Sequence, residues 1–295
     1  MAIKDSIVNL KKELRTTLTN VPALIDTLVR GLDGVAAEIT PDTAAAHNSI
    51  YRGKYLGSEV TTEQYATIEA GTFEDLYIGD YWTINSINWR IAHFDYWLGT
   101  GDTETTTHHI VIVPDQILYK HAMNTENTAE GGYYGSAMRG GENYLIENSS
   151  GLYQASEAVK AAFNASHILT HRINITNAIY ASAASAVAWT DSIVDLMSEQ
   201  QIMGSPTWSI AGKGYEIGVD KTQFALFAIN PDLITNREIY WTRSIYSANG
   251  FATIYGYGNS YFSFSTYEAG VRPVFALKGN TSENTSRKTI IVNEK

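Results

Sequence analysis

Cysteine is absent from this 295-residue sequence, which excludes disulfides, thiolate metal sites and cysteine nucleophiles. Basic residues are few: 21 Lys and Arg stand against 31 Asp and Glu, the net charge is -10, and nucleic-acid binding is not expected. No apolar run approaches the ~18 residues of a membrane span, so we expect no membrane insertion. The N-terminus has no apolar core like that of a signal peptide, and we expect synthesis in the cytoplasm.

The composition is that of a globular protein, with 44% hydrophobic and 18% charged residues. Residues 2–36 carry a helical pattern whose positions lie three and four apart: Ile3, Ile7, Leu10, Leu14, Thr17, Val21, Leu24, Leu28, Gly31 and Val35. Eight of these ten are apolar, which is typical of a heptad seam. We therefore predict that residues 1–40 form an oligomerisation or attachment segment, a helical bundle. The alternative is a pair of helices folded onto their own domain.

Residues 41–77 are predicted to be a solvated connector, because ITPDTAAAHNS is a linker-like run. Within it, residues 60–70 predict a short helix that Thr61 or Thr62 caps and Gly71 ends.

A β-rich part begins near residue 78. Alternation on both sides of Asn85-Ser86 predicts a hairpin over residues 81–91. The remaining expectations are a buried strand at 109–113, a surface loop at 122–150, helices at 153–165 and 184–197, a strand at 224–229, and a polar tail at 279–295.

The most distinctive stretch is residues 240–277. Eleven of its 38 residues are aromatic, it has no Lys or Asp and one Glu, and small residues separate the aromatic ones. Tyr provides rigid contact area at low entropic cost, and Ser, Gly and Asn provide adaptable hydrogen bonds, as in antibody loops. Composition alone leaves two interpretations open, a binding surface and a Tyr-rich sheet of an ordinary β domain.

Motifs for catalysis or metal binding are weak. His108 and His109 would point to opposite faces of a strand, and His167 and His171 are four apart but lack the glutamate of an HExxH site. No GxSxG elbow or phosphate-binding loop occurs. We predict no catalytic residue, metal or cofactor, although glycoside hydrolysis needs only two carboxylates and stays open.

Two motifs frame the aromatic stretch, YWTRS at 240–244 and GVRPVF at 270–275. This arrangement resembles the C-terminal variable region of phage tail receptor-binding proteins that retroelements diversify and that carry a C-type-lectin-like domain. The blocks at 73–97 and 108–115 are also similar to such proteins. GVRPVF-type endings occur in the related formylglycine-generating enzyme fold too, but that activity uses a cysteine pair and is disfavoured here. The calcium-ligand motifs of classical lectins are absent, so calcium-dependent sugar binding is not implied.

The resemblance implies an α+β fold, with a C-type-lectin-like domain at residues 78–278 preceded by N-terminal helices that form a trimeric bundle. It implies a homotrimer in the phage tail of the virion, joined to a tail or baseplate protein through its N-terminus. Its ligand would be a protein or glycan of the host-cell surface.

The variable region should span about residues 244–267. Adenine randomisation in such families does not produce Lys, Glu, Gln, Met or Trp codons, and these 24 residues contain none of the five. Glu268 should therefore be a fixed position or mark the edge.

Within the frame, Trp241, Phe251, Val271, Val274 and Phe275 are expected in the core. Arg243 and Arg272 are expected as framework groups bonded to backbone carbonyls. The residues expected on the displayed surface are Tyr246, Ser247, Asn249, Thr253, Tyr255, Tyr257, Asn259, Tyr261, Ser263, Phe264 and Tyr267. Alternation at 253, 255, 257 and 259 predicts one outward face of a strand.

Two rival functions follow from the sequence. One is a similar diversified binding protein that a bacterium encodes and displays on its own surface. The other is an enzyme, a glycosidase or metal-dependent hydrolase, that acts on a host polysaccharide.

Overall fold

The computed structural model describes residues 9–13, 43–180, 183–209, 220 and 222–280. The chain divides into two units, Met1–Pro41 and Asp42–Lys295. In the first unit, residues 9–13 are helical and exposed. Leu10 is the one position of the predicted heptad seam that lies among the described residues. The other seam positions and the polar tail from residue 281 lie outside them.

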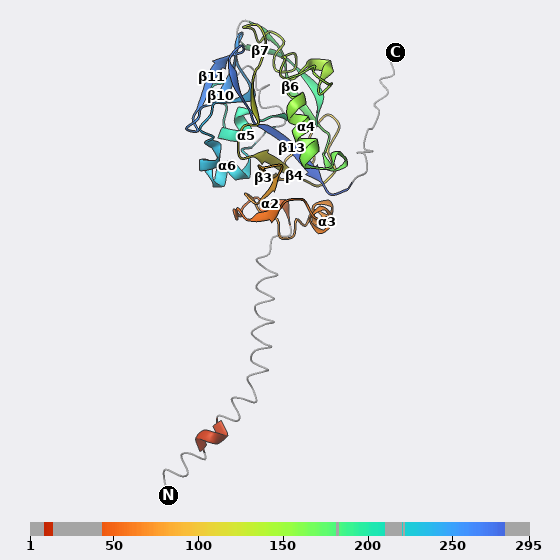
Figure 1. The fold of residues 1–295 in the computed structure, drawn as a ribbon, viewed down its shortest axis with the longest axis vertical. Helices are drawn as coiled ribbons and strands as arrows, with labels where there is room; N and C mark the ends of the chain where they lie inside the picture. The colour runs from red at the N-terminus through yellow and green to blue at the C-terminus, as the bar shows by residue number, and fades with distance from the viewer. Residues whose placement is uncertain (1–8, 14–42, 181–182, 210–219, 221, 281–295) are drawn as a thin grey trace. The chain divides into compact units, whose positions relative to one another are not determined.

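The second unit is a mixed α+β fold built mainly of sheets (Figure 1). Its six-stranded sheet has the order β1 (Tyr55–Gly57), β2 (Tyr81–Ile84), β3 (Ile87–Phe94), β4 (His109–Pro114), β13 (Pro273–Lys278) and β8 (Val194–Leu196). Its five-stranded sheet has the order β11 (Ser260–Phe264), β10 (Gly250–Ile254), β9 (Tyr240–Ser247), β12 (Glu268–Val271) and β5 (Tyr119–Ala122). A two-stranded sheet joins β6 (His171–Tyr180) and β7 (Ala183–Ser192).

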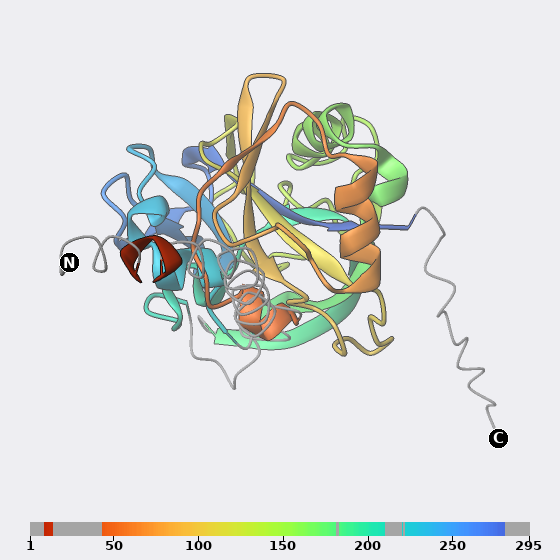
Figure 2. The ribbon, with the colours of Figure 1, turned by 90° about the horizontal axis from the view of Figure 1, so that it is seen from below.

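Most neighbouring strands are antiparallel, and β1–β2 and β9–β12 are parallel. The described helices are short: α2 (Ala44–His47), α3 (Thr62–Ala70), α4 (Tyr153–Ala162), α5 (Glu199–Met203) and α6 (Ala225–Ile229), with 3-10 turns η1 (Gly141–Asn143), η2 (Ala165–His167) and η3 (Pro231–Ile234). Helix α3 contacts β4 and β13, and Figure 2 shows it in orange beside the sheet. No helix among the described residues is long and apolar enough to cross a membrane.

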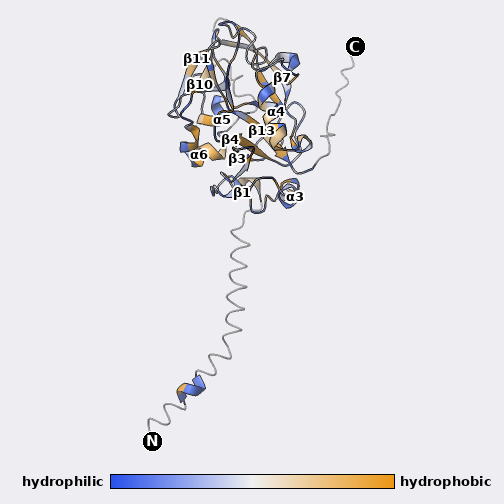
Figure 3. Cartoon of the chain, viewed as in Figure 1, coloured by the Kyte–Doolittle hydropathy of each residue, from blue (hydrophilic) through white to orange (hydrophobic). Residues whose placement is uncertain are grey.

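Several predicted elements are confirmed. The hairpin of β2 and β3 turns at Asn85 and Ser86, both with positive φ (52° and 64°), as a type I′ hairpin turn requires. Helix α3 has a capping box between Thr61 and Gln64 and ends at the left-handed Gly71. Helix α4 buries Ala155 and Val159 on one side, and Figure 3 shows both hydrophilic and hydrophobic colours along it.

Three predictions are wrong. The Ala-rich segment predicted as a helix at 184–197 forms β7 and β8, because pairing with β6 and β13 overrides the high helical propensity of alanine. The apolar run at 224–229 is helix α6 and not a strand, since a short apolar run has no periodicity that separates the two. The segment 41–77 is no simple connector, because its strand β1 pairs with β2 in the main sheet.

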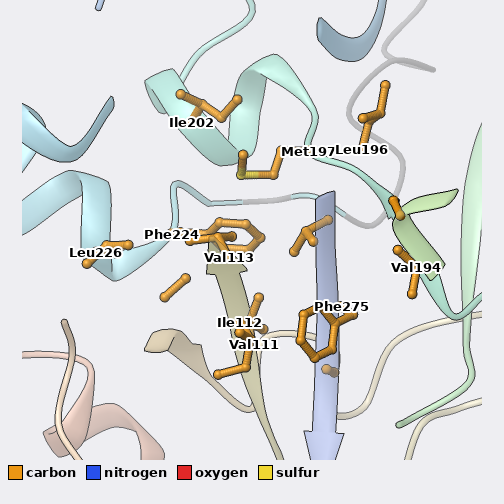
Figure 4. Close-up of a cluster of buried hydrophobic side chains, with 14 of the residues drawn as sticks. Val111, Ile112, Val113, Val194, Leu196, Met197, Ile202, Phe224, Leu226 and Phe275 are labelled. Carbon is orange, nitrogen blue, oxygen red and sulfur yellow. The ribbon is translucent and has the colours of Figure 1, made fainter. Parts of the chain in front are cut away.

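The core lies between the six-stranded sheet and the elements packed on it. Strand β4 is buried along its whole length, and Val111, Ile112 and Val113 belong to the same buried cluster as Phe275 of β13 and Phe224 before α6 (Figure 4). Side chains that are less than 2% exposed include Trp82, Trp89, Trp97 and Trp241. These buried side chains anchor the strands that residues 240–277 form.

Candidate ligand-binding surface

Each residue of the YWTRS motif, which begins β9, is bonded inside the protein. The Tyr240 hydroxyl donates to the Ile234 carbonyl (2.9 Å), and the Trp241 indole N–H donates to the His121 carbonyl (2.7 Å). The Thr242 hydroxyl donates to the Ala252 carbonyl at 2.8 Å. Because buried polar groups need partners, these bonds leave little freedom for substitution at the motif.

Arg243 is buried and contacts both a backbone carbonyl and a carboxylate. Its Nη1 donates to the Leu196 carbonyl at 3.3 Å, as expected of a framework group, and its other Nη forms an ion pair with buried Asp220. Burial alone would lower the pKa of Arg243, but Asp220 and Asp195 outweigh that effect and raise it. Arg243 therefore stays charged and holds the start of the aromatic stretch on the core.

The GVRPVF motif carries the chain from one sheet to the other: β12 ends at Val271 and β13 begins at Pro273. A Cβ on Gly270 would lie 2.3 Å from Ile117 Cγ2, so a larger residue does not fit there. Between the strands, the 1%-exposed Arg272 donates from Nε to the Pro114 carbonyl at 2.9 Å. Phe275 is fully buried against Trp89.

Between the two motifs, the segment 244–267 comprises the end of β9 and the hairpin of β10 and β11 at the edge of the five-stranded sheet. Strand β11 pairs with β10, and β11 is the terminal strand of that sheet. Glu268, expected to mark an edge, is the first residue of β12. Of the residues predicted to be displayed, Tyr257, Asn259, Tyr261, Phe264 and Tyr267 are exposed, and Tyr246, Ser247, Asn249, Tyr255 and Ser263 are half-buried.

Thr253 contradicts the prediction, because its side chain is fully buried. It lies in β10 between Trp241 of β9 and Tyr261 of β11. The predicted alternation fails because β10 ends at Ile254 and residues 255–259 form a turn, closed by a hydrogen bond from the Gly258 N–H to the Tyr255 carbonyl.

Six aromatic side chains of the segment 244–267 form one connected cluster. Tyr246 stacks on Phe262 with ring centroids 4.0 Å apart, and Phe262 stacks on Tyr261 at 4.8 Å. Tyr261 meets Tyr255 edge to face at 4.9 Å. We call the connected set the aromatic patch; its members are Trp208, Tyr246, Tyr255, Tyr257, Tyr261, Phe262 and Phe264.

Trp208 and Phe262 belong to the patch but were not among the predicted displayed residues. Trp208 lies after α5, far along the chain from the hairpin, and its ring centroid is 5.0 Å from Tyr261 and 5.4 Å from Phe262. The surrounding SPTWS places one aromatic residue among small polar ones, the same compositional signal as in the stretch itself. That signal, applied outside the framed segment, could have found Trp208.

The patch has the composition of a binding surface. Its side chains are aromatic, and burial followed by the neighbouring Tyr261 and Tyr257 raises the pKa of Tyr255, which keeps that phenol neutral. Edge-to-face and stacked rings contribute ~0.5–1.5 kcal/mol per pair beyond area burial, so the contacts also hold the rings in fixed orientations. Rigid aromatic anchors among small polar groups are the usual composition of a protein-binding hot spot.

A separate hollow of about 250 Å³ lies beside the turn of the β2–β3 hairpin, lined by Asn88, Asp115, Gln116, Tyr119 and Gln154 among others. Asp115 is its lining carboxylate, and Arg90 binds both of the Asp115 oxygens at 2.6 Å. Glycoside hydrolysis needs two carboxylates on either side of the bond, which this lining does not provide.

The histidines are scattered over different elements. His167 lies in η2 and stacks on Tyr65, whereas His171 lies in β6 and stacks on Trp97. His108 bonds Asp95, and His109 is fully buried. Within the described ranges, no group of three or more His, Asp or Glu side chains is placed to hold a metal ion.

Comparison with known proteins gives no match to a family model, a curated protein or a solved structure.

Proposed function

We propose that this chain is the receptor-binding protein of a phage tail, and that its aromatic patch binds a ligand on the host-cell surface. The observation that carries the proposal is the patch itself: seven aromatic side chains in mutual contact at a sheet edge, within a frame of buried and bonded residues.

The division between frame and patch supports a diversified surface. The framework residues Trp241, Arg243, Arg272 and Phe275 are at most 5% exposed, whereas Tyr257 is 76% exposed and Phe264 52%. Substitution at exposed positions typically changes stability by less than about 0.5 kcal/mol, so residues there can change while the fold persists. In this proposal, the mixed α+β unit is a C-type-lectin-like domain with its variable region at residues 244–267.

Multivalency completes the proposed mechanism. The seam predicted at residues 2–36 would join three copies and attach them to a tail or baseplate protein. Three patches on one particle raise weak single-site affinity, because the second and third binding events occur at a high effective concentration. Binding is an equilibrium without a chemical step.

The experiment is cell labelling with the fluorescent full-length protein on a panel of bacterial strains. The variant Tyr255→Ala/Tyr257→Ala/Tyr261→Ala should lose labelling of any strain that the wild-type protein labels. Tyr55→Ala/Tyr180→Ala is the matched control, because these tyrosines are 52% and 78% exposed on other elements, and it should label normally. Equal labelling by the triple variant would contradict the proposal.

The two rival functions have their own tests. Tail genes beside the coding sequence support a phage protein, and secretion genes support a bacterial surface protein. Depolymerisation of a host polysaccharide by the purified protein, with or without a chelator, would support an enzyme instead.

A further inference from the structure

Trp208 reaches the aromatic patch from outside the hairpin, so something must hold its loop in place. The loop follows α5, and the backbone N–H groups of Trp208 and Ser209 donate to one side chain, that of Glu199, the first residue of that helix. Glu199 is fully buried.

The Glu199 carboxylate accepts hydrogen bonds from two directions. From the loop, it accepts the Trp208 N–H (2.9 Å to Oε1), the Ser209 N–H (2.8 Å to Oε2) and the Ser209 hydroxyl (2.7 Å to Oε2). From the hairpin, it accepts the hydroxyl of Ser260, the first residue of β11. These donors, all uncharged, are the contacts that the described residues give this carboxylate.

The backbone of Glu199 is tied to β9, the strand that pairs with this hairpin. The Glu199 N–H donates to the Ser244 hydroxyl in β9 at 3.0 Å, and Ser244 is 2% exposed. One residue therefore joins the loop of Trp208 to β9 and to β11. A buried carboxylate needs several donors to offset its lost hydration, and here the donors are the groups whose relative positions set the patch.

We infer that Glu199 is a positioning residue for the ligand-binding surface, and that Trp208 forms a part of that surface which does not vary with residues 244–267. Only the ligand-binding role of Trp208 rests on the proposed function; the positioning of Trp208 by Glu199 does not. It divides the surface into a constant side at Trp208 and a variable side on the hairpin.

Replacement of Glu199 by Gln and by Ala should give different results. Hydroxyl groups can donate or accept, but backbone N–H groups only donate. The Trp208 N–H also lies 3.1 Å from Oε2, so in Glu199→Gln an amide oxygen in the place of Oε2 can accept from both loop N–H groups. The amide nitrogen then donates to the Ser260 hydroxyl, and Trp208 should stay in place. Glu199→Ala leaves two buried N–H groups without an acceptor, and the loop should move.

The structural test is ¹⁹F NMR of the full-length protein labelled with 5-fluorotryptophan. The chain has six tryptophans, and Trp208→Phe assigns the Trp208 signal. We expect Glu199→Ala to shift the Trp208 signal while those of buried Trp89 and Trp241 stay unchanged, and Glu199→Gln to leave all of them unchanged. An unshifted Trp208 signal in Glu199→Ala overturns the inference.

A milder variant covers the case in which Glu199→Ala does not fold. Ser260→Ala removes the single donor from β11 and keeps the carboxylate and the loop N–H contacts. It should shift the Trp208 signal in a folded protein, and an unshifted signal would count against the positioning role.

The binding arm uses cell labelling on a strain that the wild-type protein labels. Trp208→Ala and Glu199→Ala should each weaken labelling roughly tenfold or more, as loss of an aromatic anchor does. Trp189→Ala, a 38%-exposed tryptophan on β7, should not change it. If the NMR shift occurs but no strain is labelled, Glu199 positions Trp208 and the receptor proposal fails. If labelling is strong and Trp208→Ala does not weaken it, the receptor proposal stands and the inference fails.

Discussion

Strands β13 and β11 have similar lengths and lie near each other along the chain, but β13 is buried and β11 is largely accessible to solvent. All six residues of β13 are buried, between β4 and β8 in the six-stranded sheet. In β11, at the edge of the five-stranded sheet, only Ser260 is buried. The GVRPVF motif thus ends in a central strand, where each side chain has packing partners, whereas the segment that we propose to be variable ends in an edge strand, where side chains have few.

The largest expected effect comes from comparing one phenylalanine in each strand. Phe275→Ala in β13 should lower the free energy of unfolding by about 4 kcal/mol, because a fully buried ring leaves a cavity. Phe264→Ala in β11, where the ring is 52% exposed, should lower it by about 0.5 kcal/mol or less. Urea denaturation of both variants measures the difference, and equal losses would contradict the division into frame and surface.

The buried pair of Arg243 and Asp220 should rank next. Arg243→Ala leaves the Asp220 carboxylate buried without its partner and should cost about 3 kcal/mol. The double variant Arg243→Met/Asp220→Leu removes both charges and should recover much of that loss. Arg237→Ala, at an exposed position, is the control and should be neutral in the same denaturation experiment. A double variant as unstable as Arg243→Ala would show that the charge itself is not what matters.

Acid should destabilise the folded protein through its buried histidines. Burial, then His109, lowers the pKa of His93 to about 3, and burial, then His109 and Arg243, holds the pKa of His171 well below its usual value. In the unfolded chain both have a pKa near ~6.5 and bind protons first. Stability is therefore highest above about pH 6.5 and falls by about 1.4 kcal/mol per neutral histidine by pH ~5.5.

His171→Phe tests that contribution, since a phenyl ring can keep the stacking on Trp97 without titrating. The variant should lose about 1.4 kcal/mol less than the wild type between pH ~7.5 and ~5.5, measured by urea denaturation at each pH. Equal pH dependence of the two proteins would show that His171 is not held neutral.

A small effect on stability is expected at the patch, although three substitutions are made together. Tyr255→Ala/Tyr257→Ala/Tyr261→Ala removes three rings from the surface and should lower the free energy of unfolding by about 1.5 kcal/mol or less. A loss as large as that of Phe275→Ala would place these rings in the frame and not on the display surface.

Local patterns predicted the elements that local chemistry determines. Asn85-Ser86 gave the hairpin turn, and Thr61 with Gly71 gave both ends of α3, because turns and caps depend on a few neighbouring residues. Strand β7 and helix α6 were predicted in the wrong class, because their conformation depends on β6 and on packing that no local pattern reports.

The candidate site shows the same limit. The framed stretch predicts most of its members. Trp208 was missed, and Thr253 was wrongly predicted to be displayed. The reason is that exposure at a sheet depends on where each strand ends and on which loop covers it. Glu199 looks like an ordinary first-turn glutamate in the sequence, and only its burial shows that it joins two elements.

The most direct test of the central claim is hydroxyl-radical footprinting of the protein, free and bound to bacterial cells that it labels. Tyr257 on the patch and Tyr180 on β6 are 76% and 78% exposed, so they should oxidise alike in the free protein. On cells, we predict that Tyr257 is protected and that Tyr180 is oxidised as before. Protection of Tyr180 with unchanged oxidation of Tyr257 would contradict the account.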